Sequence, residues 1–259
     1  MNQMNPLTDE IIAETRRHYD EGKAAGARRY FKEPINCWGI PMPVCKEIAA
    51  SFYPRLKDDL QLNIEVVGEL HRQSIFEVAV VGDYMLSRMK KHLTPSHFDT
   101  FDQWVDTLTN WANTDGMCTG LVSETVRKDP RLIGRLLEWT ASENRWRRRA
   151  AAVCLVPIAR KGEMLDDAFR LADRLMEDRD DMVQKGVGWL LKEASKKHPA
   201  EVRDYLLKWR TRTSALILRK ASEKLPADMR VLKRSWGSPV PTLSRSPSLC
   251  HPRCRLRGT

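Results

Sequence analysis

The sequence predicts an all-helical protein: an α-solenoid of HEAT-like helix pairs that curves into a superhelix with a concave face. Two observations carry this prediction. Apolar residues recur at spacings of three and four through most of the chain, without runs that alternate at period two. A unit of about 35 residues also repeats along the sequence, which is typical of stacked helix pairs.

The helical spacing is clearest in four segments: "EVAVVGDYMLSRM", "LIGRLLEWT", "AFRLADRLM" and "VGWLLKEASK". Turn and cap signals such as "LTPSH", "RKDP" and "KKHP" separate helices of about 10 to 18 residues. These signals favour short antiparallel helices that pack against one another in sequence order.

The repeat is visible in three segments: "TPSHFDTFDQW", "DPRLIGRLLEW" and "HPAEVRDYLLKW". Each begins with a proline in the first turn, where the missing amide proton costs nothing, and each ends on a tryptophan. One helix pair cannot bury its apolar stripe alone, so the pairs must stack. We therefore expect the tryptophans Trp104, Trp139 and Trp209 to lie in the core.

The composition divides the 259 residues into a folded domain, 1–232, and a tail, 233–259. The formal net charge of +10 is uneven, because six basic residues and no acidic ones lie in this Ser- and Pro-rich tail. A segment of this kind is predicted to be disordered. Its Cys250, His251 and Cys254 lack a fourth ligand nearby, so we expect no metal site there.

The chain has no pattern of a secretory signal or a membrane span. The longest apolar run, "AAAVCLVPIA", is about half the length that a span requires. The six cysteines are scattered, mostly within helical patterns, which suits reduced thiols better than a disulfide framework. We expect a cytoplasmic protein with no membrane partner.

A row of cations recurs with the repeat. Arg149, Lys185 and Lys220 each precede a small residue, in "RRRAAA", "QKGVG" and "RKAS", at intervals of 36 and 35 residues. Stacking places equivalent positions of successive repeats side by side, so these side chains are predicted to line one wall of the superhelix. A row of this kind favours a polyanionic partner.

The segment "NRWRRRAAAV" adds charge to this row. At 100° per residue, Arg145, Arg148 and Arg149 share one sector of the helix, and Arg147 points toward the neighbouring repeat. No carboxylate follows at helical spacing to offset them, so we expect these arginines to be available to a ligand. Duplex DNA fits best, because a superhelix can follow its phosphates without reading sequence; RNA or an acidic protein is the alternative.

One carboxylate interrupts the row. One repeat before Arg149, the equivalent position falls at Thr114 and Asp115, in "NWANTDGMC", with Trp111 four residues before Asp115. A carboxylate there repels the phosphates that its neighbours attract. Two interpretations follow: Asp115 is a helix cap or a salt-bridge partner of Arg149, or it stabilises a cation that develops during a reaction.

Three motifs in this order, "NWANTD", "ENRWRRRAA" and "VQKGVGWLLKEASKKHP", resemble the AlkD family of DNA alkylation-repair glycosylases, which are built from HEAT-like repeats. The resemblance extends from "ARRYFK" through "LRKASEKLP" and excludes the tail. It implies five roles: Asp115 is catalytic, Trp111 and Trp189 contact the lesion, and Arg149 and Tyr30 contact DNA. Asn110 departs from the family, which often has an aromatic residue there.

The resemblance implies a DNA glycosylase that hydrolyses the N-glycosidic bond of cationic N3- or N7-alkylated purines in duplex DNA, the first step of base excision repair. It implies no metal or cofactor, and a monomer in the bacterial cytosol and nucleoid. Arg148, Lys185 and Lys220 are then expected to hold phosphates near the lesion. The alternative is a non-catalytic HEAT-like binder of damaged or branched DNA, which has no need of Trp111 and Asp115 together.

Overall fold

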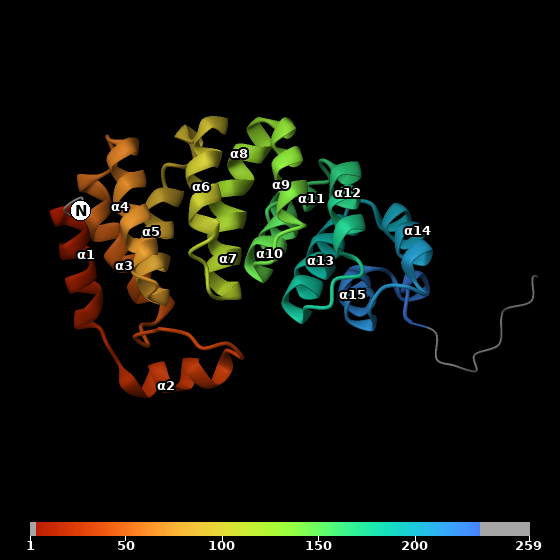
Figure 1. Cartoon of the computed structure of the whole chain (residues 1–259), viewed down its shortest axis with the longest axis horizontal. Coiled ribbons are helices and arrows are strands. Elements are labelled where there is room, and N and C mark those ends of the chain that lie inside the picture. Colours follow the sequence, from red (N-terminus) through yellow and green to blue (C-terminus); the bar gives the residue numbers. More distant parts are fainter. Residues whose placement is uncertain (1–3, 234–259) are drawn as a thin grey trace, which may run out of the picture.

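The computed structural model describes residues 4–233, and this part of the chain is helical, without a strand. Residues 234–259 of the tail, with Cys250, His251 and Cys254, lie outside the described residues. The α-helices follow one another in a row (Figure 1). Their bounds are α1 Pro6–Arg17, α2 Glu21–Tyr30, α3 Met42–Phe52, α4 Leu60–Arg72, α5 Phe76–Ser87, α6 Phe98–Val105, α7 Trp111–Met117, α8 Ser123–Lys128, α9 Ile133–Trp139, α10 Arg145–Val153, α11 Val156–Ala159, α12 Leu165–Leu175, α13 Asp181–Ala194, α14 Pro199–Trp209 and α15 Ala215–Ala221.

Successive helix pairs stack along the row, from α4 with α5 to α14 with α15 (Figure 1). Equivalent side chains join neighbouring pairs. The indole nitrogen of Trp139 donates to Asp102 at 3.0 Å across 37 residues, and that of Trp209 donates to Asp173 at 3.1 Å across 36 residues. The same contact recurs in a later repeat, which confirms the predicted solenoid and its unit of about 35 residues.

The repeat signals occupy the positions that the sequence predicts. Three prolines start a helix or the short 3₁₀ turn that leads into one: Pro95, Pro130 and Pro199. Trp104 and Trp139 are buried, as expected, whereas Trp209 is only half-buried at the end of α14. The guanidinium of Arg212 lies 4.1 Å from the centre of the Trp209 ring and partly covers it.

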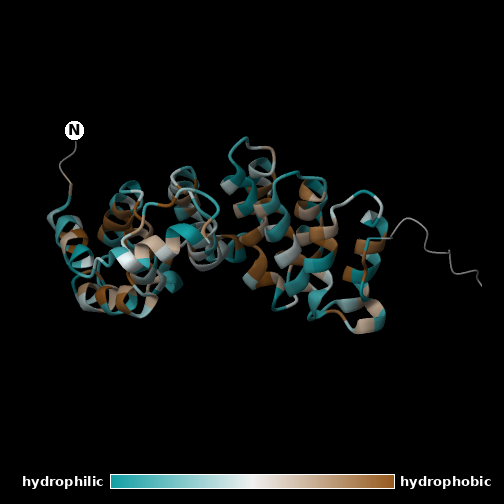
Figure 2. Cartoon of the chain, turned by 90° about the horizontal axis from the view of Figure 1, so that it is seen from below, coloured by the Kyte–Doolittle hydropathy of each residue, from teal (hydrophilic) through white to brown (hydrophobic). Residues whose placement is uncertain are grey.

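One hydrophobic core runs along the row, from Leu7 to Val231. Viewed from below, most loops are hydrophilic, and the hydrophobic residues lie mainly on the helices (Figure 2). The four cysteines among the described residues are buried and free, as expected for reduced thiols. None of the helices between residues 4 and 233 combines the length and hydrophobicity that a membrane span requires.

Helix α2 departs from this pattern. It lies beneath the row in Figure 1 and has its own small apolar cluster, formed by Ala24, Ile35 and Cys37. The segment that follows α2 returns to the row at α5, where the amide of Phe76 donates to the carbonyl of Asn36 at 2.8 Å. Helix α2 is therefore attached to the solenoid without being one of its repeats.

Candidate active site

A cleft of about 510 Å³ opens where four helices of the row meet the end of α2. Its walls come from α7, α10, α13 and α15, together with the segment around Tyr30. The structure thereby brings together most residues that the sequence predicts for the site. The lining residues are Tyr30, Lys32, Trp111, Asp115, Arg149, Met182, Lys185, Trp189, Lys192 and Lys220.

Asp115 is held in place by the way α7 begins. The side chain of Asn110 caps this helix by accepting from the amide of Asn113 at 2.9 Å, which fixes the first turn. Asn110, which departs from the AlkD pattern, therefore has a structural role. After Met117 the helix widens into a π-turn, Cys118–Val122, a feature found often at functional sites.

Asp115 and Arg149 form a bidentate ion pair. The Nε and Nη2 atoms of Arg149 each donate to a carboxylate oxygen of Asp115, both at 2.8 Å. Nη1 donates to the carbonyl of Met182 on α13, so Arg149 joins three elements of the row. Its side chain is 6% exposed and that of Asp115 is 16% exposed. A parallel pair of charge-assisted bonds holds the carboxylate in one orientation at the edge of the cleft.

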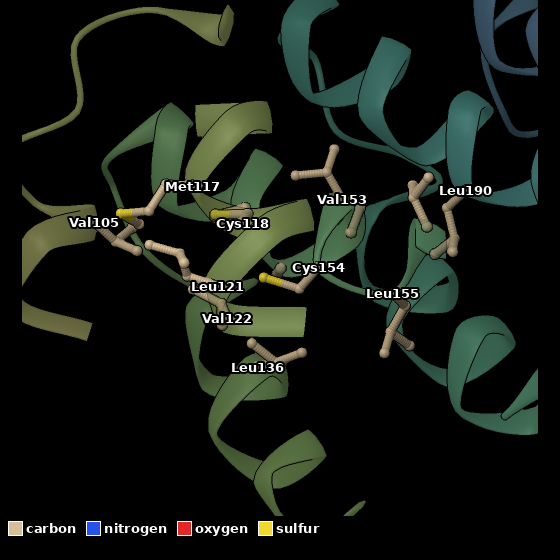
Figure 3. Packing of buried hydrophobic residues seen from close by; sticks show 14 of the residues in the cluster. Val105, Met117, Cys118, Leu121, Val122, Leu136, Val153, Cys154, Leu155 and Leu190 are labelled. Carbon is tan, nitrogen blue, oxygen red and sulfur yellow. The ribbon is translucent and has the colours of Figure 1, made fainter. Parts of the chain in front are cut away.

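Small residues behind Arg149 make room for this pair. A Cβ on Gly186 would lie 3.3 Å from Cγ of Arg149. A Cβ on Gly188 would lie 2.6 Å from Cβ of Lys220, too close for any real side chain, so glycine permits α15 to approach α13. Beneath them, buried side chains such as Cys118, Leu121 and Val153 pack α7 and its π-turn against α10 (Figure 3).

Two tryptophans line the cleft with the carboxylate. Trp111 lies one helical turn before Asp115, and Trp189 lies on α13. Phe31 stacks on Trp111 with ring centres 5.4 Å apart, and Tyr30 meets the same ring edge-on at 6.3 Å. Both tryptophans are half-buried, so part of each ring remains open to a ligand.

Three of the four lysines of the cleft lie on one face of α13 and on the adjacent α15. Lys185 and Lys192 lie two turns apart on α13, and Lys220 is on α15. Acidic residues outside the lining balance some of this charge. Lys185 pairs with Asp181 at 2.9 Å, whereas Lys192 and Lys220 approach Glu223 at 3.7 Å and 3.5 Å. The two pairs with Glu223 are long, and ion pairs of this kind contribute little to stability.

The expectation that Arg145, Arg148 and Arg149 are available to a ligand is wrong, because each of them pairs with a carboxylate. The partners come from neighbouring repeats rather than from the same helix. Arg148 donates to Asp178 at 2.7 Å and to two loop carbonyls, and it does not line the cleft. Arg145 pairs with Asp180 at 2.8 Å. Of the four arginines on α10, Arg149 is the one that the structure brings to the cleft.

Arg147 follows its prediction. It points toward the preceding repeat, where its guanidinium pairs with Asp102 and Asp106 and lies 5.2 Å from the centre of the Trp139 ring. Helix α10 therefore has one arginine toward the cleft and one on its far side.

Burial raises the pKa of Asp115 above its ordinary value of 3.8, and the hydrogen bonds and charge of Arg149 oppose this rise. The desolvation effect is the larger of the two. The carboxylate is thus a stronger base than an exposed aspartate and gains more from a nearby positive charge. A perturbed carboxyl group in a cleft is typical of functional sites.

Three lining residues were not predicted from the sequence: Lys32, Met182 and Lys192. Lys192 follows Lys185 by seven positions, so helical spacing was a signal that could have found it. Lys32 reaches the cleft through the path of the chain after α2, for which the sequence has no such signal. Residues 4–233 contain no cluster of potential metal ligands, and Cys250, His251 and Cys254 lie outside that range.

The fold and the cleft define a helical-repeat protein with a cationic cleft built around one paired carboxylate. The chain belongs to the DNA alkylation repair enzyme family, whose sequence profile matches residues 11–225. Comparison with curated protein sequences gives no significant match.

Solved structures with this fold include two alkylation-repair proteins. A predicted DNA alkylation repair enzyme from Enterococcus faecalis is 19% identical, with a TM-score of 0.69, and the match covers 81% of this chain and 98% of that one. AlkD2 from Streptococcus mutans is 20% identical, with a TM-score of 0.55, and the match covers 72% of this chain and 91% of that one. At these identities the likeness shows the fold, and the site has to be argued from its own residues.

Proposed function

We propose that this protein is a DNA glycosylase that hydrolyses the N-glycosidic bond of purines carrying a cationic N3- or N7-alkyl group in duplex DNA. The observation that carries the proposal is the position of Asp115. It is a partly buried carboxylate with a raised pKa, and it shares its cleft with two tryptophans and five cationic side chains. Membership of the DNA alkylation repair enzyme family agrees with this assignment.

The chemistry needs little more than such a carboxylate. An alkylated purine already carries positive charge, so it departs as a neutral base without strong protonation. The deoxyribose left behind becomes oxocarbenium-like, and a fixed carboxylate next to it stabilises that charge in the transition state. Asp115 also accepts a proton from the attacking water.

Arg149 positions this carboxylate. Its two bonds to Asp115 fix the orientation of both oxygen atoms before DNA binds, which lowers the reorganisation that the reaction requires. The faces of Trp111 and Trp189 pack against the sugar or base, where the negative face of an indole ring favours a developing cation.

The lysines hold the phosphates that flank the lesion. Lys185, Lys192 and Lys220 line the cleft from α13 and α15, and Tyr30 and Lys32 line it from the end of α2 and the segment after it. Their weak ion pairs are exchanged for phosphate contacts on binding, with release of counterions from DNA. The protein acts as a monomer without a cofactor in this proposal.

A second function, non-catalytic binding of damaged DNA, is favoured by one observation. The bidentate bonds from Arg149 use both oxygens of Asp115, as a purely structural ion pair does. The two functions differ in whether base is released.

The decisive assay incubates excess protein with a duplex containing one N7-methylguanine and measures free base by mass spectrometry in a single turnover. Release well above the rate of spontaneous depurination supports the glycosylase. Binding without release supports the non-catalytic binder instead. An unmodified duplex of the same sequence is the matched control, and it should lose no base.

A further inference from the structure

The cleft has one wall that is not part of the solenoid. This wall is the strap, which we define as Glu21–Glu33: helix α2 and the three residues that follow it. The strap supplies Tyr30 and Lys32 to the cleft, whereas the other lining residues come from the stacked helices. Its apolar contacts are few, because α2 packs on a small cluster separate from the main core.

The base of the strap is firmly fixed. The carboxylate of Glu77 on α5 accepts from the amides of Trp38 and Gly39, both at 2.8 Å, and of Ile40 at 3.1 Å. The amide of Asp20 donates to the carbonyl of Trp38 at 2.9 Å, so the residue before the strap is tied to the chain that follows it. Gly39 has φ of 73° and leaves no space for a Cβ there, which makes this junction rigid.

The far end of the strap is held by the ring contacts of Tyr30 and Phe31 with Trp111 and by two ion pairs, which we call the clasp. Lys32 pairs with Asp181 at 3.2 Å, and Glu33 pairs with Arg145 at 3.4 Å. Both partners belong to repeats more than a hundred residues away, so the clasp closes the strap across the cleft.

The clasp is weak by its own geometry. Lys32 and Asp181 are well exposed, and exposed pairs contribute little. Glu33 is largely buried, yet its Oε2 atom has no hydrogen-bond partner, which disfavours the closed state. A strap that is anchored at its base and held at its tip by two weak ion pairs and a few ring contacts opens more easily than the repeats separate.

We propose that the strap is a hinged wall whose clasp limits the size of the alkyl group that the cleft accepts. This inference rests on the proposed glycosylase function and adds a determinant of substrate range to it. Opening moves Tyr30 and Lys32 away from α13, and it withdraws Phe31 from Trp111. The cleft then admits a bulkier N7 substituent, while a methyl group fits whether the strap is open or closed.

The test variant is Glu33→Gln, which weakens the clasp with almost no change in volume and does not touch the cleft lining. The single-turnover rates of base release are measured for duplexes with N7-methylguanine and with N7-benzylguanine. We expect the benzyl-to-methyl rate ratio to rise about two- to fivefold, the range that one such ion pair contributes to an opening equilibrium. Adding Asp181→Asn releases the second pair and should raise the ratio to about tenfold.

The matched control is Glu143→Gln, because Glu143 is exposed near Arg145 and makes no ion pair among the described residues. It should leave the ratio unchanged. Hydrogen exchange of the α2 amides, measured without DNA, reports opening independently of catalysis and should be faster in Glu33→Gln.

The two proposals fail differently. An unchanged rate ratio, or unchanged exchange of α2, in Glu33→Gln overturns the hinged wall even when wild-type protein releases both bases. If the wild type releases neither base, the glycosylase proposal falls and this inference falls with it.

Discussion

Arg147 and Arg149 lie two positions apart on α10, and both are bound to carboxylates of the preceding repeat. Arg147 pairs with Asp102 and Asp106 at the back of the row, against the ring of Trp139. Arg149 pairs with Asp115 at the edge of the cleft. The chemistry of the two contacts is the same, but only the second lies beside open space that a ligand can fill.

The comparison teaches that charge density in a sequence does not measure charge available to DNA. Each arginine of the run has an acidic partner, so none is held free for phosphate. The pair at the back joins two repeats. The pair in the cleft does the same and also orients a carboxylate, and the predictions below separate these two roles.

The largest effect is expected for Asp115→Asn. The change removes the charge with little change in volume, so duplex binding should be kept or improved while base release falls about 100-fold or more, as for loss of one preorganised stabilising group. Single-turnover release of N7-methylguanine and a parallel binding titration measure the two quantities. Release at the wild-type rate would make Asp115 structural.

Arg149→Ala should lower the rate of base release at pH 7 by about 10- to 100-fold, because the carboxylate loses its orientation. It should also change the pH profile. Release by the wild type should fall on acidification at a pH above 3.8, since burial raises the pKa of Asp115 and only the ionised form is active. Arg149 lowers that pKa, so the variant should lose activity at a still higher pH.

The raised pKa of Asp115 also determines how its contribution to folding stability changes with pH. A carboxyl group whose pKa is raised by folding stabilises the protein below its unfolded value, near 3.8, and this contribution is lost as the pH rises through the folded pKa. Ionised Asp115 therefore costs folding free energy at neutral pH. Arg147→Ala is the control for the pH profile of base release, and it should leave that profile unchanged.

Arg147→Ala should instead lower the free energy of unfolding by about 1–3 kcal/mol, because it leaves Asp102 and Asp106 with fewer partners and uncovers Trp139. Urea unfolding followed by circular dichroism measures this change. The single-turnover rate on N7-methylguanine should stay within about twofold of the wild type. A large loss of activity with unchanged stability would reverse the roles assigned to the two arginines.

The smallest effects concern the lysines. Lys185→Ala and Lys220→Ala should each reduce the slope of log affinity against log salt by about one unit, for duplex DNA of any sequence. The structure predicts no change in slope for Arg148→Ala, since Arg148 is bound to Asp178 outside the cleft. Equal loss of slope in all three variants would show that the arginine run contacts DNA after all. The measurements should be repeated with residues 233–259 removed, because that basic segment adds a slope of its own.

The sequence by itself determined the helical class, the repeat and much of the cleft. Helix periodicity depends only on the spacing of residues within one helix, so it can be recognised in each repeat separately. The same holds for the proline that begins each repeat segment and the tryptophan that ends it. The 36- and 35-residue intervals placed Arg149, Lys185 and Lys220 in a row, because stacking converts equal spacing into proximity. The family resemblance added Trp189 and Tyr30, which line the same cleft.

Only the tertiary structure decided which charges remain open to a ligand. The partners of Arg145, Arg147 and Arg148 come from loops and helices of other repeats, at separations that helical periodicity does not encode. The course of the strap, which brings Lys32 to the cleft, depends on Glu77 holding the chain at α5. The local sequence pattern determines which face of a helix a residue lies on. Which side chains that face contacts is determined by packing between elements far apart in the chain.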